Sequence, residues 1–359
     1  MLARFKNTAQ NVMPTKRIQT VDALIDSGFA VPEDRPALSH VAKHFAIGIS
    51  EHVAQHINPN DPDDPLRKQY VPDPQERTIQ PEEQDDPIGD QPHTKVPGII
   101  HRYPDRCLLT PIRVCAVYCR FCFRKEHIGP GSATLTPEEL DQAMHYVATH
   151  PEIWEVILTG GDPLMLKPAS LHNIMQRLDA INSVEIIRFH TRIPVVSPEK
   201  VTPALIQAIK STSKTPYVLL HINHAKELTT EAKQAIAQII DAGIPMLSQT
   251  VLLRGINNDI DTLSELMKQL VKNRIKPYYL HHPDLAKGTQ HFRVTIEEGQ
   301  QLLARLRGRF SGLCQPDYVL DIPGGFGKVP IQQSYLQDRG EGRYDVFDHH
   351  GKQHFYTSS

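Results

Sequence analysis

From residue 101 onward, short runs of apolar and β-branched residues alternate with longer segments of helical character. These runs have the length and composition of β-strands, and they span 106–112, 155–160, 184–190, 217–222, 245–252, 277–281 and 318–321. They are apolar rather than alternating, which is typical of a parallel sheet covered on its outer face by helices. Six strand–helix units followed by one more strand predict a β/α barrel, closed or partly open. An open doubly wound sheet is the competing arrangement, although no GxGxxG motif follows the first strand to support it.

Start signals mark several of the intervening helices. Threonine in the capping position, followed by proline or by a glutamate three residues later, predicts a helix start. This pattern occurs at Thr136–Glu139, Thr202-Pro203, Thr262–Glu265 and Thr295–Glu298. Gly243 stands where a glycine would end a helix. The sequence therefore predicts helices between the strands, as the barrel requires.

The chain outside the barrel region has a different composition. Residues 1–56 are predicted to be partly helical. Residues 57–100 combine many prolines with Asp, Glu and Gln, and a stretch of that kind does not form a core of its own. We expect an extended arm there, or a flexible linker, laid over the surface or over a second subunit. The barrel is expected over 101–330, and a short C-terminal tail over 331–359.

Composition excludes several classes of function. The 39 basic and 41 acidic residues give a net charge of −2, so nothing in the balance argues for a nucleic-acid or anionic-membrane partner. No run of about 18 apolar residues occurs that could span a bilayer. The first residues lack the continuous apolar stretch of a secretory signal. We therefore expect a cytoplasmic protein.

Three of the five cysteines lie close together directly after the first predicted strand. Cys115, Cys119 and Cys122 have the spacing C-x3-C-x2-C. Thiolates suit iron–sulfur clusters or zinc, and three ligands leave one metal position open to a substrate or cofactor. A structural zinc site completed by a distant ligand such as His127 is the alternative, but such sites usually use paired CxxC units. The other two, Cys107 and Cys314, are predicted to be buried apolar residues.

This cysteine motif resembles that of the radical SAM superfamily, whose members hold a 4Fe–4S cluster with three cysteines. In that superfamily the open iron binds S-adenosylmethionine, and Phe121 matches the aromatic position before the last cysteine. Gly160, Gly161 and Asp162 follow the second predicted strand and are similar to the turn that meets the amino group of S-adenosylmethionine. The glycines allow close backbone approach, and the carboxylate can accept a hydrogen bond from an ammonium group.

Further motifs, between about residues 62 and 335, resemble the lysine 2,3-aminomutase family. They are HRYPDR (101–106), CRFCFRK (119–125), RFHTRIPVV (188–196) and DIPGGFGK (321–328). The resemblance implies a second cofactor, pyridoxal 5′-phosphate, bound through Lys328 on a glycine-rich loop, with Arg102 and Arg106 at its phosphate. A lysine on such a loop can move, and Schiff-base chemistry needs a deprotonated amine.

The same resemblance implies the remaining site residues and the reaction. Arg124 is expected to bind the carboxylate of an amino-acid substrate, and Asp284 and Asp321 to bind the distal ammonium of lysine. The implied reaction is a radical migration of the amino group between carbon 2 and carbon 3 of L-lysine, giving β-lysine. An electron donor such as a flavodoxin or ferredoxin and a homo-oligomeric state are also implied.

Several alternatives remain open in the sequence. Two anionic side chains argue against glutamate as the substrate, whereas an arginine substrate could also pair with them, so they discriminate less well between lysine and arginine. Phe326 replaces a glycine of the family's lysine loop, and the segment HINHA (221–225) resembles the branch that supplies β-lysine for modification of elongation factor P. A zinc-stabilised binding protein without radical chemistry is the alternative from a different class.

Overall fold

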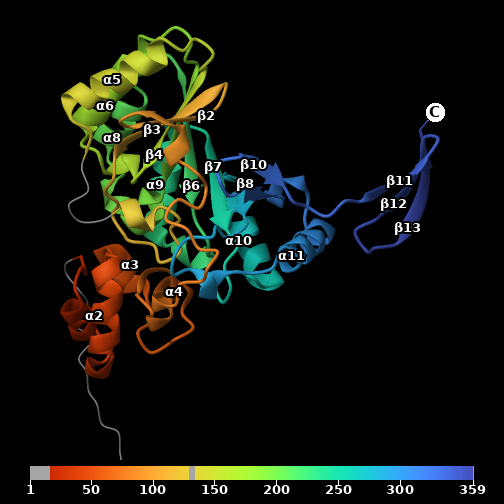
Figure 1. Cartoon of the computed structure of the whole chain (residues 1–359), viewed down its shortest axis with the longest axis horizontal. Coiled ribbons are helices and arrows are strands. Elements are labelled where there is room, and N and C mark those ends of the chain that lie inside the picture. The colour runs from red at the N-terminus through yellow and green to blue at the C-terminus, as the bar shows by residue number, and fades with distance from the viewer. Residues whose placement is uncertain (1–16, 129–133, 359) are drawn as a thin grey trace, which may run out of the picture.

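One large sheet dominates the computed structural model, which describes residues 17–128 and 134–358 (Figure 1). Its strand order runs from β1 to β10 without interruption, so each strand lies beside its neighbours in the chain. The parallel strands are β3 (Arg106–Ile112), β4 (Glu155–Gly160), β5 (Ile186–Thr191), β6 (Thr215–His221), β7 (Met246–Val251), β8 (Lys276–His281) and β9 (Asp317–Asp321). Antiparallel strands extend both edges: β1 (Thr94–Val96), β2 (Ile99–Tyr103) and β10 (Lys328–Pro330).

Helices connect successive parallel strands and cover the outer face of the sheet (Figure 1). They are α5 (Pro137–Ala148), α6 (Pro168–Asp179), α7 (Ile193–Val196), α8 (Pro203–Ile209), α9 (Thr230–Asp241), α10 (Ile260–Lys272) and α11 (Ile296–Arg309). Before the sheet come α1 (Val21–Asp26), α2 (Arg35–His44), α3 (Glu51–His56) and α4 (Pro65–Tyr70). Among the described residues no helix is long and apolar enough to cross a membrane.

The predicted partial barrel is confirmed. All of the strands expected from the apolar runs are present, with ends shifted by no more than two residues. In the described part of the chain, β1 and β10 pair with no strand beyond their single neighbours, so the barrel stays open. The doubly wound alternative is wrong, because such a sheet reverses its strand order at one point and this order never reverses.

The helix starts are mostly as predicted. Thr136 and Thr295 form reciprocal capping boxes with Glu139 and Glu298. The start predicted at Thr262 is wrong. Helix α10 begins one turn earlier, because the Asp259 carboxylate accepts hydrogen bonds from the backbone N–H groups of Asp261 (3.1 Å) and Thr262 (2.9 Å). An aspartate caps a helix at least as well as a threonine.

Strand alternation separates an apolar outer layer from a polar interior. Outward side chains such as Leu109, Leu158 and Phe189 are fully buried in the main core with the helices. Because side chains alternate along a strand, their neighbours Thr110, Thr159 and His190 face the inside of the barrel. The interior therefore has the polar character of a binding site.

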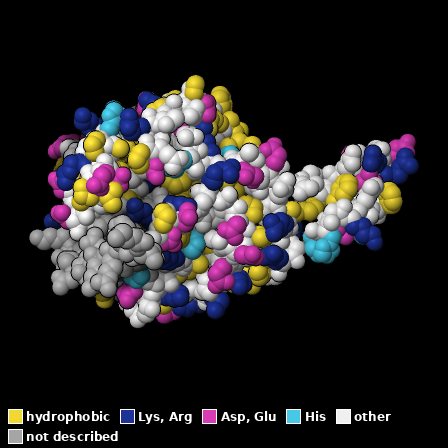
Figure 2. All heavy atoms as spheres, turned by 90° about the horizontal axis from the view of Figure 1, so that it is seen from below, with side chains coloured by type: hydrophobic (Ala, Val, Ile, Leu, Met, Phe, Trp, Pro, Cys, Tyr) yellow, Lys and Arg dark blue, Asp and Glu magenta, His cyan; other side chains and the backbone are white. Residues whose placement is uncertain are grey.

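The last residues form an element that the sequence analysis did not predict. Strands β11 (Leu336–Gly340), β12 (Arg343–Phe347) and β13 (Gln353–Thr357) make a separate antiparallel sheet. It stands away from the body of the molecule (Figures 1 and 2). The domain boundaries expected at residues 56, 100 and 330 stay predictions.

Candidate active site

The loop that carries Cys115, Cys119 and Cys122, called the cysteine loop below, lies between β3 and α5. The N-terminal segment holds it in place. The Tyr118 N–H donates to the carbonyl of Gly48 (2.7 Å), and the Arg120 N–H donates to the carbonyl of Gln69 (2.9 Å). Within the loop, the Cys122 N–H donates to the carbonyl of Cys119 (3.2 Å). The loop therefore takes its shape from residues far away in the sequence. The side chain of His127, the alternative zinc ligand, lies outside the described residues.

A buried ion-pair triad supports the same loop. The Arg120 guanidinium makes two hydrogen bonds to the Glu76 carboxylate (2.8 and 2.6 Å), and the Lys125 ammonium adds a third (3.1 Å). The three side chains are at most 1% exposed. Arg120 also donates to the carbonyl of Ala46 (2.6 Å). Glu76 belongs to the proline-rich stretch, which thus packs against the loop in the protein interior.

The three loop thiols share one electrostatic neighbourhood. Burial is the main cause that raises the pKa of Cys115, and the charges of Asp162, Cys122 and Cys119 raise it further. Burial also raises the pKa of Cys119 to about 12, although Arg192 opposes the shift. Three half-buried thiols with raised pKa values need a compensating positive charge before they ionise together, and bound iron provides it.

The Gly160–Asp162 turn packs directly against the start of the cysteine loop. Gly160 has a positive φ of 97°, and a Cβ on Gly161 would lie 2.5 Å from the backbone of Val114. The Asp162 carboxylate accepts from the Thr191 hydroxyl (2.7 and 2.9 Å), the Arg192 N–H (2.7 Å) and the Leu164 N–H (3.0 Å). The carboxylate is thus engaged within the protein and fixes the turn. Burial raises its pKa to about 6.

A second buried network, which the sequence analysis missed, reaches the cysteine loop from β5 and β6. Arg192 pairs with Glu227 and donates to the side-chain oxygen of Gln69 (3.1 Å). Glu227 also accepts from the backbone N–H groups of Asn223 (2.8 Å) and His224 (2.9 Å). Arg192 belongs to the motif RFHTRIPVV, but the sequence analysis gave it no role of its own. In the structure its positive charge acts on the Cys119 thiol and opposes the rise that burial causes in the pKa of that thiol.

Lys328 stands at the start of β10, opposite Asp321 in the antiparallel register. Its ammonium pairs with the Asp321 carboxylate and lies 3.3 Å from Nδ1 of His281. Its backbone N–H donates to the hydroxyl of Tyr103 (2.7 Å). Burial raises the pKa of Asp321, but the hydrogen bond from His281 and the charge of Lys328 outweigh that effect and hold it below its usual range.

Asp284 joins this group from the loop after β8. Its carboxyl group is half-buried, and this partial burial together with the Asp321 charge raises its pKa to about 7. The charges of Lys328 and Arg124 act on it in the opposite direction. The structure thus brings Asp284, Asp321, Lys328 and Arg124 close enough for their charges to act on one another.

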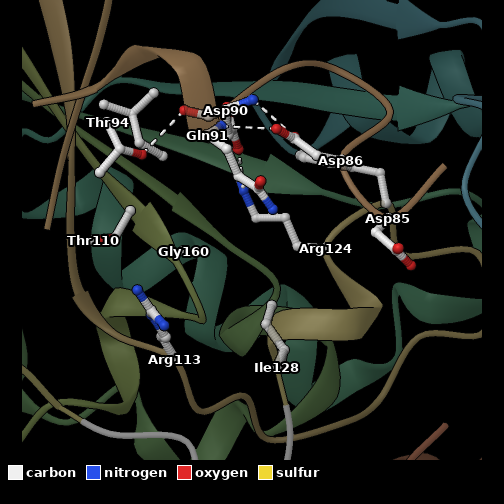
Figure 3. A pocket seen from close by; sticks show the side chains of 12 residues that line it. Asp85, Asp86, Asp90, Gln91, Thr94, Thr110, Arg113, Arg124, Ile128 and Gly160 are labelled. Carbon is white, nitrogen blue, oxygen red and sulfur yellow. Dashed lines mark hydrogen bonds and ion pairs between the residues drawn. The ribbon is translucent and has the colours of Figure 1, made fainter. Parts of the chain in front are cut away.

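Arg124 and Arg102 meet on one carboxylate that the sequence analysis did not single out. Asp90 accepts from Nε of Arg124 (2.9 Å) and from the guanidinium of Arg102 (3.0 Å), as Figure 3 shows for Arg124. All three side chains are at most 15% exposed. A cavity of about 180 Å³ adjoins them, and its lining includes Thr110, Arg113, Phe123 and Gly160. Asp90 lies in the stretch 57–100, which is rich in proline and acidic residues. The sequence analysis interpreted that stretch as an arm or linker, so Asp90 was not considered as a site residue.

Two further predicted site residues, Arg106 and Phe121, make contacts outside the Asp90 group. Arg106 lies over the Tyr103 ring (3.9 Å) and pairs with Asp105 (2.7 Å), so it does not share the Asp90 contact of Arg102. Phe121 packs edge-on against Phe292, with ring centroids 6.3 Å apart. The Arg192 guanidinium lies 5.4 Å from the Phe121 ring.

Three interior histidines complete the site and were also missed. The rings of His190 and His221 lie 5.8 Å apart, and His281 contacts Lys328. Burial lowers the pKa of His221 to about 3, and it also lowers the pKa of His190 and His281. All three are neutral at pH 7. In the described part of the chain, Nε2 of His190 and of His281 has no hydrogen-bond partner, and such buried groups normally find one.

Comparisons with known proteins agree with this geometry. The sequence model of the Radical SAM superfamily matches residues 109–267, which contain the cysteine loop and the glycine turn. The L-lysine 2,3-aminomutase of Clostridium subterminale is 37% identical over 320 residues, which cover 89% of this chain and 77% of that protein. The L-lysine 2,3-aminomutase of Escherichia coli is 36% identical over 295 residues, covering 82% of this chain and 86% of that protein. The chain belongs to the lysine 2,3-aminomutase family.

A relative that is named for a different substrate is nearly as similar. The glutamate 2,3-aminomutase of Clostridioides difficile is 33% identical over 327 residues, covering 91% of this chain and 77% of that protein. The protein is therefore a radical SAM aminomutase, an isomerase that uses a 4Fe–4S cluster and S-adenosylmethionine. The zinc-stabilised binding protein considered above is thereby excluded.

Proposed function

We propose that this aminomutase interconverts L-lysine and β-lysine, and that pyridoxal 5′-phosphate is its second cofactor. One observation carries the proposal. Two carboxylates, Asp284 and Asp321, share a half-buried site with the cations Lys328 and Arg124. A substrate with a carboxylate at one end and an ammonium at the other matches both kinds of charge.

The residues present fit pyridoxal phosphate. Lys328 offers a primary amine in a half-buried polar setting, next to a loop in which Gly324, Gly325 and Gly327 have positive φ angles. Among the described residues, Nε of Arg102 is a buried donor without a partner, and Nε2 of His190 and Nε2 of His281 are buried ring nitrogens without one. We propose that Lys328 binds the aldehyde and that Arg102 and Arg106 face the phosphate. The bound cofactor supplies a conjugated system that stabilises an unpaired electron next to nitrogen.

The cluster and S-adenosylmethionine are assigned to the cysteine loop. We propose that Cys115, Cys119 and Cys122 hold the cluster, and that Phe121, Gly160, Gly161 and Asp162 form the S-adenosylmethionine site. This pair of cofactors supplies the one-electron chemistry that removes hydrogen from an unactivated carbon. The Gly160–Asp162 turn presents backbone rather than its carboxylate, since all the hydrogen bonds of Asp162 described above are internal.

Substrate specificity is proposed to come from the charged side chains. Arg124 takes the substrate carboxylate in place of Asp90, because a bidentate guanidinium suits either anion. Asp284 and Asp321 take the distal ammonium. Glutamate is disfavoured, because its second carboxylate would add a third negative charge beside Asp284 and Asp321. The enclosing barrel excludes water and stray hydrogen donors. A flavodoxin or ferredoxin is the proposed electron donor, and a homo-oligomer the proposed assembly.

An anaerobic assay tests the proposal. The enzyme, with reconstituted cluster, S-adenosylmethionine, pyridoxal phosphate and dithionite, is given lysine, arginine or glutamate in parallel. We expect β-lysine from lysine, weak turnover of arginine and none of glutamate. Lys328→Ala should abolish both turnover and the adduct that borohydride traps, whereas Lys233→Ala, on the exposed face of α9, should leave both unchanged. Turnover of glutamate without lysine would show that the substrate assignment is wrong.

A further inference from the structure

Two histidines and a glutamate form a cluster between α3 and α9. His52 and His56 lie on α3, four residues apart and therefore on the same helix face. Glu231 lies in the first turn of α9. One ligand atom from each side chain can be chosen so that all three lie within 4.8 Å of one another. The cluster uses no residue of the cysteine loop or of the pyridoxal phosphate site.

The tautomer of His56 leaves a ring nitrogen free for a metal. Nδ1 of His56 lies 2.8 Å from the carbonyl oxygen of His52. A carbonyl only accepts hydrogen bonds, so in the neutral imidazole Nδ1 carries the proton and Nε2 keeps its lone pair. A hydrogen bond from the second ring nitrogen to a carbonyl is the usual support of a metal-binding histidine.

His52 and Glu231 complete the cluster. One ring nitrogen of His52 lies 3.3 Å from the Thr229 hydroxyl, and the His52 ring centroid lies 4.6 Å from that of His56. The Glu231 side chain is exposed in the first turn of α9.

We infer that His52, His56 and Glu231 bind a zinc ion. Two imidazole nitrogens and one carboxylate oxygen are a donor set that zinc accepts, with the fourth tetrahedral position left to water. Two imidazoles exclude magnesium and calcium, which prefer oxygen ligands alone. The ligand atoms need to close by about an ångström, since donors in a tetrahedral zinc site lie about 3.3 Å apart at Zn–N distances near 2.0 Å.

Such an ion would join α3 to α9 and thereby fix the segment that supports the cysteine loop. Helix α3 follows Gly48, whose carbonyl receives the Tyr118 N–H of that loop. The hydroxyl of Ser50, the N-cap of α3, donates to the carbonyl of Val196 in α7. Zinc would add a third attachment, from the other end of the helix. The ion's role is structural, and it stabilises the folded chain by mass action.

A zinc titration of the cluster-loaded enzyme, in which iron already occupies the cysteines, tests this inference. Free zinc is set with a chromophoric chelator under anaerobic conditions, and bound zinc, retained iron and the melting temperature are measured. We expect one zinc per chain, full retention of iron and a higher melting temperature. His56→Ala and Glu231→Gln should each weaken zinc binding by at least about 10-fold.

Helix α2 provides a matched control. His40 and His44 are exposed and also lie four residues apart, with ring centroids 5.5 Å apart. In the part of the chain that the structure describes, no third ligand completes that pair. His40→Ala should leave zinc binding unchanged. The inference is overturned if no zinc binds to the cluster-loaded enzyme, if Glu231→Gln binds zinc as tightly as the unaltered chain, or if His40→Ala weakens binding equally. None of these outcomes depends on the substrate of the enzyme.

Discussion

Asp284 is the residue at which substrate binding should depend on pH. Its pKa is raised to about 7 by burial first and by Asp321 second. A cationic substrate binds the ionised form, which makes up roughly a tenth of the molecules at pH 6 and roughly nine tenths at pH 8. Asp321 keeps its charge over this whole range, because its pKa lies below the usual value. The two aspartates therefore play different parts, although they were predicted together.

We expect the KM for lysine to rise about tenfold when the pH falls from 8 to 6. Asp284→Asn should raise the KM at pH 8 and remove most of this pH dependence. The measurement is the initial rate against lysine concentration at constant ionic strength, with S-adenosylmethionine and pyridoxal phosphate saturating. The same pH slope in both proteins would contradict the assignment of Asp284 to the ammonium.

The ligand-free protein offers a second readout of the same residue. The folded pKa of about 7 lies above the ordinary value of 3.8 for this carboxyl, so this group contributes stability that is fully present below pH 3.8 and is lost as the pH rises through 7. The free energy of unfolding relative to Asp284→Asn should therefore fall between pH 4 and pH 8, by an amount on the order of a few kcal/mol. Denaturant unfolding of both proteins measures this difference.

At the scale of elements, the sequence predicts structure that depends on neighbouring residues and misses contacts between residues that are far apart in the chain. The strands and most helix starts follow from apolar runs and capping residues only a few positions apart. The supports of the cysteine loop do not, because Glu76 lies 44 residues before Arg120 in the chain. Its surroundings of proline and acidic residues indicated a solvated arm. The burial of this carboxylate depends on two cations that only the folded chain brings to it.

Removal of the Glu76 charge should destabilise the cysteine loop. Glu76→Gln leaves the buried cations Arg120 and Lys125 without their anion, and breaking such a buried pair costs about 3–5 kcal/mol. We expect a lower free energy of unfolding and less iron per chain after reconstitution. Asp261→Asn is the control, because its pair with Arg309 is exposed and worth about 1 kcal/mol at most. Equal iron content in both variants would show that the triad does not hold the loop.

At the scale of the whole molecule, the barrel topology accounts for the part of the site that was predicted. Parallel strands in chain order place their carboxyl ends at one mouth, so motifs at those ends had to meet there. Asp90 and the interior histidines escaped prediction for two reasons. Asp90 lies outside the parallel strands. His190 and His281 lie within strands, and the sequence alone does not show which face of the strand their side chains occupy. The Asp90 contact also explains why Arg102 and Arg124 lie together, which strand order alone does not require.

The separate sheet β11–β13 should be dispensable for the fold and the site. In the described part of the chain, no hydrogen bond links residues 336–358 to any residue before Ser334. Its apolar side chains Phe355 and Tyr356 are 86% and 60% exposed, so they add nothing to the core of the barrel. We expect a chain that ends at Ser334 to keep its iron content, its melting temperature within a few degrees, and the borohydride-trapped adduct on Lys328. A chain that ends at Gly327 is the control, since it lacks β10 and Lys328 and should lose that adduct. Loss of iron or of soluble protein in the longer truncated chain would show that the segment stabilises the barrel, for which His349 beside Gly308 of α11 offers a contact.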